Sequence, residues 1–119
     1  MTNLETFIAG YVEAILWANA YTENDETGEI ESVDALFYDE NDYSESVETE
    51  DAKAFYSDNL ETLTEVHETY AQAWDYMGHD FALTRNGHGA GFWDRGHGAL
   101  GEKLSEAARV YGEASVYIP

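Results

Sequence analysis

The chain has 119 residues, which suits one domain and leaves little room for two. It contains no cysteine, which excludes disulfides and thiolate metal sites and favours a cytoplasmic location. With 25 acidic and 5 basic residues, its formal net charge is −20. We therefore expect the protein to repel nucleic acid, membranes and acidic substrates, and to attract cations or a basic protein surface.

The charge is unevenly distributed along the chain. Residues 1–80 contain 21 acidic residues and a single base, Lys53, whereas residues 81–119 contain four of each sign. The whole excess of −20 therefore belongs to the first two-thirds. Adaptation to high salt would spread acidic residues over the entire surface, so this asymmetry favours a dedicated interaction surface.

The first predicted element is an amphipathic helix. Apolar residues recur at three- and four-residue steps from Leu4 to Leu16, with Thr2 or Asn3 available as the cap and an expected end near Tyr21. Residues 22–49 are polar and weakly periodic, so we expect a surface loop, with one short helix around residues 30–37.

A long second helix is predicted from Thr49 to Met77, with a break near residues 57–59 left open. One face is an apolar stripe that includes Phe55, Leu63 and Trp74. The opposite face carries an acidic column, whose members are Asp58, Glu61, Glu65, Glu68 and Asp75.

The pattern then changes. Residues 81–84 and 90–93 suggest two strands around Asn86-Gly87, a strong hairpin signal. A further helix is expected over residues 100–111 and a last strand over residues 115–118. The predicted fold is α+β, with about three helices packed on a small antiparallel sheet formed by the hairpin 80–94 and the C-terminal strand. Residues 1–119 form one domain, with an acidic helical part (1–78) and a second part (79–119).

The segment GHDFALTRNGHGAGFWDRG, residues 78–96, resembles a signature of short, acidic, uncharacterised proteins encoded by bacteriophages and some bacteria. The similarity covers roughly residues 78–117. This chain departs from the family pattern at Ala82, where a second aromatic is expected, and in lacking the longer C-terminal tail. The resemblance implies an origin in a mobile element, and it carries over neither an activity nor any functional residues.

The four histidines and one glycine motif are candidate chemical sites. The histidines (His67, His79, His88 and His97), with Asp80 or Asp94 as further ligands, show no recognised metal spacing. Residues 96–101 match the dinucleotide pattern G-x-G-x-x-G, but the chain is too short for the fold that this motif needs. We therefore expect turns and close packing at these glycines, and no metal or cofactor.

A polar site beside the predicted hairpin could be formed by Arg85, Trp93, Asp94 and Arg95. A structural role is favoured, in which Asp94 pairs with Arg85 or Arg95. No nucleophile–base pair is evident, so we assign no catalytic residues and do not expect an enzyme.

The acidic column is the strongest functional candidate. Carboxylates three and four residues apart on a helix lie ~5–6 Å from each other, roughly the repeat of phosphates along one DNA strand. We expect the column, with Glu45 and Glu48, to imitate nucleic acid and to bind and inhibit a basic nucleic-acid-binding protein of the host, such as a restriction or other defence component. One alternative is a non-catalytic accessory protein whose acidity reflects salt adaptation or solubility. A third is a small metal-binding protein or enzyme centred on the His/Gly-rich hairpin.

Overall fold

The computed structural model describes residues 1–38 and 41–119. In chain order the elements are α1 (Asn3–Ala18), β1 (Ala20–Glu23), β2 (Ile30–Val33), η1 (Ser44–Ser46), α2 (Glu50–Asp58), α3 (Leu60–Tyr70), α4 (Trp74–Arg85), η2 (Phe92–Asp94), α5 (Gly98–Arg109) and β3 (Val116–Ile118). The predicted α+β class is confirmed. The expected number of about three helices is wrong, since the described residues form five α-helices besides two 3₁₀ turns.

Helix α1 starts as predicted. The Thr2 hydroxyl accepts the N–H of Glu5, and the Glu5 carboxylate accepts the N–H of Thr2, which completes a capping box. The helix ends at Ala18 rather than near Tyr21, because Ala20 begins strand β1.

The sheet is mixed and has the order β2-β1-β3. β1 pairs antiparallel with β2 and parallel with β3, so that Thr22 lies between Glu31 and Ile118. The predicted C-terminal strand is therefore confirmed, but its partners are different from those expected. Residues 34–38 and 41–49 form the expected loop, apart from η1, and residues 39–40 lie outside the described residues. The short helix expected around residues 30–37 is wrong, because β1 and β2 pair there as a β-hairpin. Its turn is organised by Asn24, whose side-chain oxygen accepts the N–H groups of Glu26 and Thr27.

The long helix expected over residues 49–77 is three separate helices. The first break falls at Asn59, near the position left open by the sequence, where φ is −117° and ψ is 15°. The second break was missed: Ala71 adopts the left-handed conformation with φ 55°, which ends α3. The ring Nδ1 of His67 lies 2.8 Å from the carbonyl oxygen of Gln72 and holds this turn.

The hairpin predicted over residues 80–94 is also wrong. Residues 81–85 complete α4, and Asn86-Gly87 terminates that helix instead of joining two strands. Gly87 has a φ of 70°, its N–H donates to the carbonyl of Thr84, and the N–H of His88 donates to that of Leu83. These are the two hydrogen bonds of a Schellman motif. No second strand forms over residues 90–93, since residues 92–94 form the 3₁₀ turn η2.

Two glycines bring α1 and α4 into backbone contact. A Cβ at Gly10 would clash with the carbonyl group of Asp75, and a Cβ at Gly78 would clash with the carbonyl oxygen of Phe7 and lie 2.8 Å from the N of Tyr11. Both positions are buried. The absence of side chains therefore allows the two helices to approach more closely than larger residues would permit.

The core is aromatic and is assembled from elements far apart in sequence. The ring of Phe55 in α2 stacks 4.2 Å from that of Phe81 in α4. Phe7 packs against both of these rings, and Phe92 packs against Phe55. All four are fully buried.

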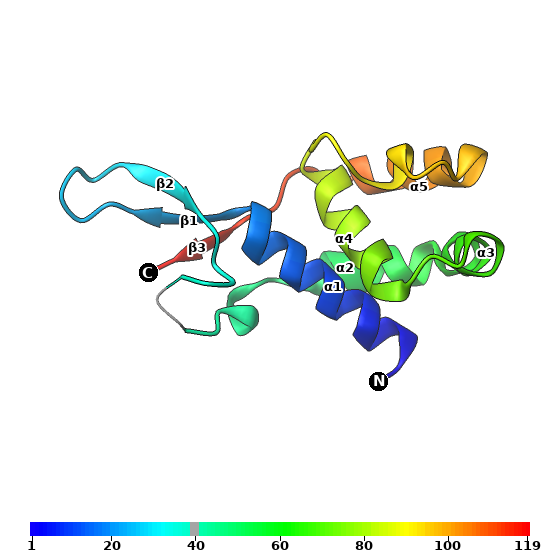
Figure 1. Cartoon of the computed structure of the whole chain (residues 1–119), viewed down its shortest axis with the longest axis horizontal. Coiled ribbons are helices and arrows are strands. Elements are labelled where there is room, and N and C mark those ends of the chain that lie inside the picture. Colours follow the sequence, from blue (N-terminus) through cyan, green and yellow to red (C-terminus); the bar gives the residue numbers. More distant parts are fainter. Residues whose placement is uncertain (39–40) are drawn as a thin grey trace.

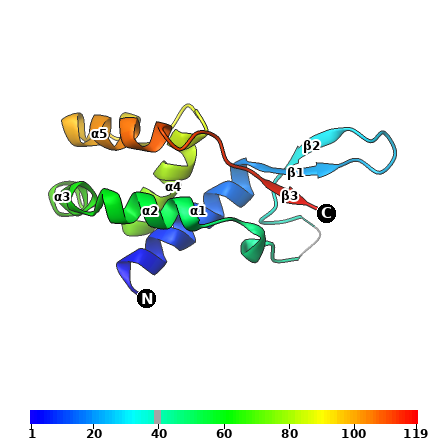
Figure 2. The same ribbon diagram turned by 180° about the vertical axis from the view of Figure 1, so that it is seen from behind.

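The helices gather at one end of the molecule, and the sheet extends from the other (Figures 1 and 2). The principal extents are 50 × 28 × 20 Å. The β1–β2 hairpin projects farthest from the helices, while α3 lies at the opposite end (Figure 1). No helix among the described residues is long and apolar enough to cross a membrane.

Candidate functional site

The acidic column predicted from the sequence is centred on α3. Glu61, Glu65 and Glu68 are exposed, while Thr62, Leu63 and Val66 form the buried face of the same helix. The helical period therefore separates carboxylates from core on α3. From Glu61 to Glu68 the backbone rises by about 10 Å, so the three carboxylates form one short row.

The row does not continue as a rigid rod. Asp58 is exposed at the end of α2, beyond the bend at Asn59, and Asp75 is exposed in the first turn of α4. Figures 1 and 2 show α3 end-on while α2 lies across the view, so the two helices run in different directions. Glu45 and Glu48 are exposed but belong to η1 and the segment after it, on the far side of the helical body from α3 (Figure 1). The seven predicted partner-binding residues are therefore not one continuous column.

These carboxylates form no ion pair with the described residues. Over residues 1–38 and 41–119 the ion pairs join Lys53 to Glu50, His79 to Glu13, Arg85 to Asp51 and Arg95 to Asp80. Asp58, Glu61, Glu65 and Glu68 take part in none of them. Their charge is available to an external partner.

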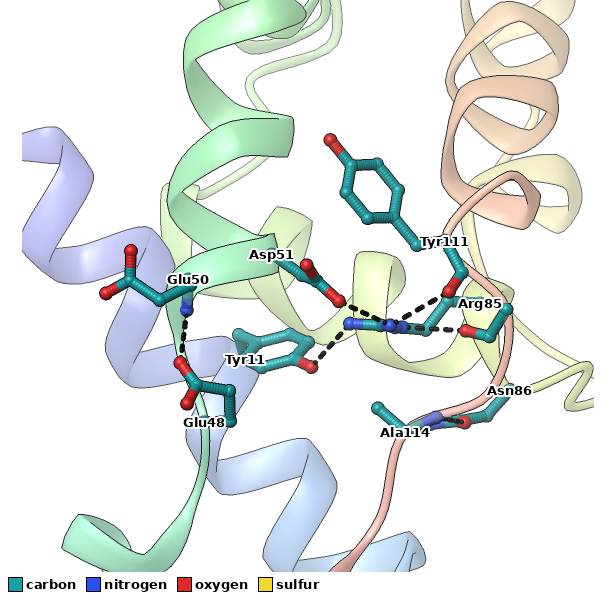
Figure 3. A network of polar contacts seen from close by, with 9 residues as sticks. Tyr11, Glu48, Glu50, Asp51, Arg85, Asn86, Tyr111 and Ala114 are labelled. Atoms are coloured by element: carbon teal, nitrogen blue, oxygen red, sulfur yellow. Dashed lines mark hydrogen bonds and ion pairs between the residues drawn. The ribbon is translucent and has the colours of Figure 1, made fainter.

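Arg85 holds four segments together from the interior (Figure 3). Its guanidinium donates to Asp51 at 2.8 Å, to the hydroxyl of Tyr11 at 3.0 Å, and to the carbonyls of Tyr111 and Gly112. It also lies over the rings of Phe81 and Tyr111. Burial is the main cause of a raised pKa at Tyr11, and the charge of Arg85 opposes that shift. The network is structural: it ties α1, α2 and the segment after α5 to the end of α4.

A second arginine pairs with a fully buried carboxylate. Arg95 Nη2 lies 2.7 Å from Asp80 Oδ1, and its Nε contacts both carboxylate oxygens. Burial raises the pKa of Asp80 against the opposing effect of Arg95, whereas the hydrogen bond to Asp80 raises the pKa of Arg95. A raised pKa at Asp80 favours its neutral form, whereas a raised pKa at Arg95 favours its charged form. The difference follows from burial, because Asp80 has no exposed surface while 38% of the Arg95 side chain reaches solvent.

His97 lies beside this pair and precedes α5. It is 4% exposed, and neither ring nitrogen has a hydrogen-bond partner in the described part of the protein. Its ring packs 4.5 Å from that of Tyr70. Burial lowers the pKa of His97, and the negative charge of Asp80 partly offsets this effect.

The polar cluster expected from Arg85, Trp93, Asp94 and Arg95 is not assembled. The arginines pair with Asp51 and Asp80 rather than with Asp94, whose carboxylate accepts the N–H of Gly91. The reason is that Arg85 ends α4 pointing into the core, whereas residues 91–95 fold back along that helix as η2.

The glycine motif of residues 96–101 and the candidate metal ligands are the remaining sites suggested by the sequence. Gly96 and Gly98 adopt positive φ angles of 76° and 58° where α5 begins, and 3₁₀ turn η2 precedes them rather than a parallel strand. Across the described ranges, no three His, Asp or Glu side chains are grouped so that they could hold a metal ion.

Comparison with protein-family models, curated proteins and solved structures found no match to this chain.

Sequence reasoning missed the hairpin and the two arginine–aspartate pairs, each of which has one buried member. Asn24 and Gly28 between two polar, β-compatible runs are a turn signal that could have indicated the hairpin. The arginine pairs join residues 34 and 15 positions apart and follow only from the tertiary fold.

Proposed function

We propose that this is a phage-type acidic binding protein that occupies the basic groove of a host nucleic-acid-binding protein and so inhibits it. The observation that supports this most is the set of exposed, unpaired carboxylates on α2 and α3. Asp58, Glu61, Glu65 and Glu68 lie at one end of the molecule and have no basic partner among the described residues.

The chemistry of such a surface matches a groove lined by Lys and Arg. A protein that binds DNA gains affinity by releasing the counterions that surround the phosphates. Carboxylates fixed on a helix create a similar negative field, so the same basic side chains can bind them. Because α3 carries a row of three rather than a long rod, the imitation covers a few phosphates, and the other carboxylates add long-range attraction.

The first experiment identifies the partner and tests exclusion. The immobilised protein captures binding proteins from a bacterial lysate, and mass spectrometry names them. For a purified partner we expect mutually exclusive binding: its cognate nucleic acid should displace the acidic protein, with an affinity that falls as salt increases. Simultaneous binding of both would contradict mimicry.

The second experiment separates the α3 surface from net charge. The variant Asp58→Asn, Glu61→Gln, Glu65→Gln, Glu68→Gln removes four charges without opening the core. The matched control Asp25→Asn, Glu26→Gln, Glu102→Gln, Glu106→Gln removes four other exposed charges. We expect the first variant to lose at least tenfold in affinity and to show a flatter salt dependence, while the control changes little. Equal losses would favour the salt-adaptation or solubility alternative, in which acidity acts only in bulk.

A further inference from the structure

The second surface open to a partner is the outer edge of the hairpin. Strand β2 lies at the edge of the sheet, and the hairpin projects away from the helices at the end opposite α3 (Figures 1 and 2). Ile30 is 58% exposed, and Glu31 and Ser32 are exposed as well.

The register fixes which backbone groups of β2 are free. The N–H of Asn24 donates to the carbonyl of Glu29 at 2.8 Å, so these two residues form a hydrogen-bonded antiparallel pair. Such pairs alternate with non-bonded pairs, which places the N–H and C=O groups of Ile30 and Ser32 on the side away from β1. Within the described residues no other strand covers that side. An added strand would find four unused backbone groups there.

The side chains of β2 specify the chemistry of that strand. Alternation places Glu29 and Glu31 on one face of the sheet and Ile30 and Ser32 on the other. The ion pairs among the described residues include neither Glu29 nor Glu31, and the neutral side-chain amide of Asn24 is a hydrogen-bond donor to the Glu31 carboxylate. A complementary strand therefore carries basic residues on one face and apolar residues on the other.

We propose that the β2 edge binds an extended segment of a basic partner, with basic and apolar residues in alternation, as a fourth strand of the sheet. A second copy of this chain is not the occupant, because it would bring Glu29 and Glu31 against like charges. The inference takes the basic character of the partner from the proposed function, but it assigns a separate contact surface.

The test uses a seven-residue peptide in which lysine alternates with valine. On its addition to the full chain, we expect amide shifts and slower hydrogen exchange at Ile30 and Ser32. The amide of Glu31 already faces β1 and serves as the internal reference. A peptide of the same composition with its lysines in one block should bind at least tenfold more weakly, as should an alternating peptide N-methylated on one edge.

A matched pair of variants tests the edge from the protein side. Ser32→Pro removes an N–H that makes no bond to β1, so the sheet should persist, whereas Ser32→Thr keeps that N–H. We expect at least a tenfold loss of peptide affinity in the first variant and none in the second. Equal binding by both variants, or by all three peptides, would overturn the proposal and leave only non-specific attraction.

Two further measurements distinguish the occupants and the two proposals. A dimer in analytical ultracentrifugation that Ser32→Pro abolishes would overturn the choice of occupant in favour of a second copy. The four substitutions at residues 58–68 should leave peptide binding intact while weakening the target complex. If the variant loses target binding but keeps peptide binding, both the acidic surface on α2 and α3 and the β2 edge are supported as contact surfaces. If only peptide binding fails, the β2-edge proposal alone is overturned.

Discussion

Arg85 and Arg95 each find a carboxylate, but the two pairs differ in their contact with solvent. The carboxylate of Asp51 is half exposed and its arginine is buried, whereas Asp80 is fully buried and its arginine reaches solvent. Removing an arginine is therefore costlier where it leaves Asp80 without a counterion. The sequence showed both arginines but offered Asp94 as their partner, because nearness along the chain says little about which carboxylates a fold brings together.

His97 gives a residue-scale prediction that depends on pH. Its pKa is lowered by burial, so its contribution to stability is complete above the unfolded value of about 6.5 and is lost as pH falls through the lower folded value. His97→Phe removes the two unpartnered buried nitrogens, and with them the only group at this position that can bind a proton. Urea denaturation at pH 7.5 should show stability that is unchanged or higher by about 1 kcal/mol.

The decisive comparison is the difference between variant and wild type as pH decreases. Between pH 7.5 and 5.5 we expect this difference to grow in favour of His97→Phe, since only wild type has an imidazole at this position that binds a proton when unfolding exposes it, and this uptake favours the unfolded state. A constant difference would contradict the role given to His97. Any cost of fitting the larger ring would lower the variant's free energy of unfolding equally at both pH values, so the change of the difference with pH would remain.

At the scale of elements, the contact between α1 and α4 predicts an intolerant glycine. Gly78→Ala would place a methyl group against the carbonyl oxygen of Phe7 and the N of Tyr11, both of which are backbone atoms that cannot rotate away. We expect a loss of about 3 kcal/mol in the free energy of unfolding, near the upper end for overpacking. Chemical denaturation of the variant provides the measurement.

Gly89→Ala is the matched control. Nothing lies within 4 Å of its added Cβ, and Gly89 is not among the glycines with positive φ. This substitution should be neutral or stabilise the protein slightly, because it restricts the unfolded chain. Similar losses in the two variants would show that glycine itself, rather than the helix crossing, determines the effect.

The helices that were predicted well are those specified by local sequence. α1 has an apolar period and a capping box, and α5 has a similar period followed by Gly112 with a φ of 70°. The dipeptide Asn86-Gly87 led to the wrong prediction of a hairpin, because the same dipeptide suits both a type I′ turn and a helix C-terminus. The deciding fact was that the apolar face of α4 continues through Phe81.

The other errors had non-local causes. Ala71 ends α3 in a left-handed conformation that no glycine or asparagine announces. The hairpin is polar because it projects from the core. Its first strand, β1, is the central strand of the sheet and pairs with Val116–Ile118 from the opposite end of the sequence. For the acidic surface, the helical period correctly placed Glu61, Glu65 and Glu68 on the exposed side of α3. The bend at Asn59 lies where the sequence left a break open, but its effect on the direction of the column follows only from the packing of the helices.

At the scale of the whole molecule, like charges act against the fold. Because 25 acidic residues face 5 basic ones, screening should stabilise the native state. We expect the free energy of unfolding to rise on the order of 1–2 kcal/mol between 0.05 and 1 M NaCl, as several like-charge pairs are each relieved of a few tenths. Urea denaturation across a salt series measures it.

The variant with four neutralised charges at residues 58–68 provides the reference for this prediction. Effects of salt on apolar burial are common to both proteins, so only the electrostatic part should shrink in the variant. Its rise in stability with salt should therefore be smaller than that of wild type. Parallel salt curves would mean that repulsion among these carboxylates does not limit stability.

The close crossing of α1 and α4 also constrains the order of events during synthesis. Gly10 and Gly78 are 68 residues apart, and at 5–20 residues per second roughly 3 to 14 s pass between them on the ribosome. During that interval Phe7 and Tyr11 have left the site of peptide-bond formation without the helix that will cover them. A nascent chain arrested before residue 74 should accordingly be a client of ribosome-associated chaperones, and one arrested well beyond residue 85 should bind them less.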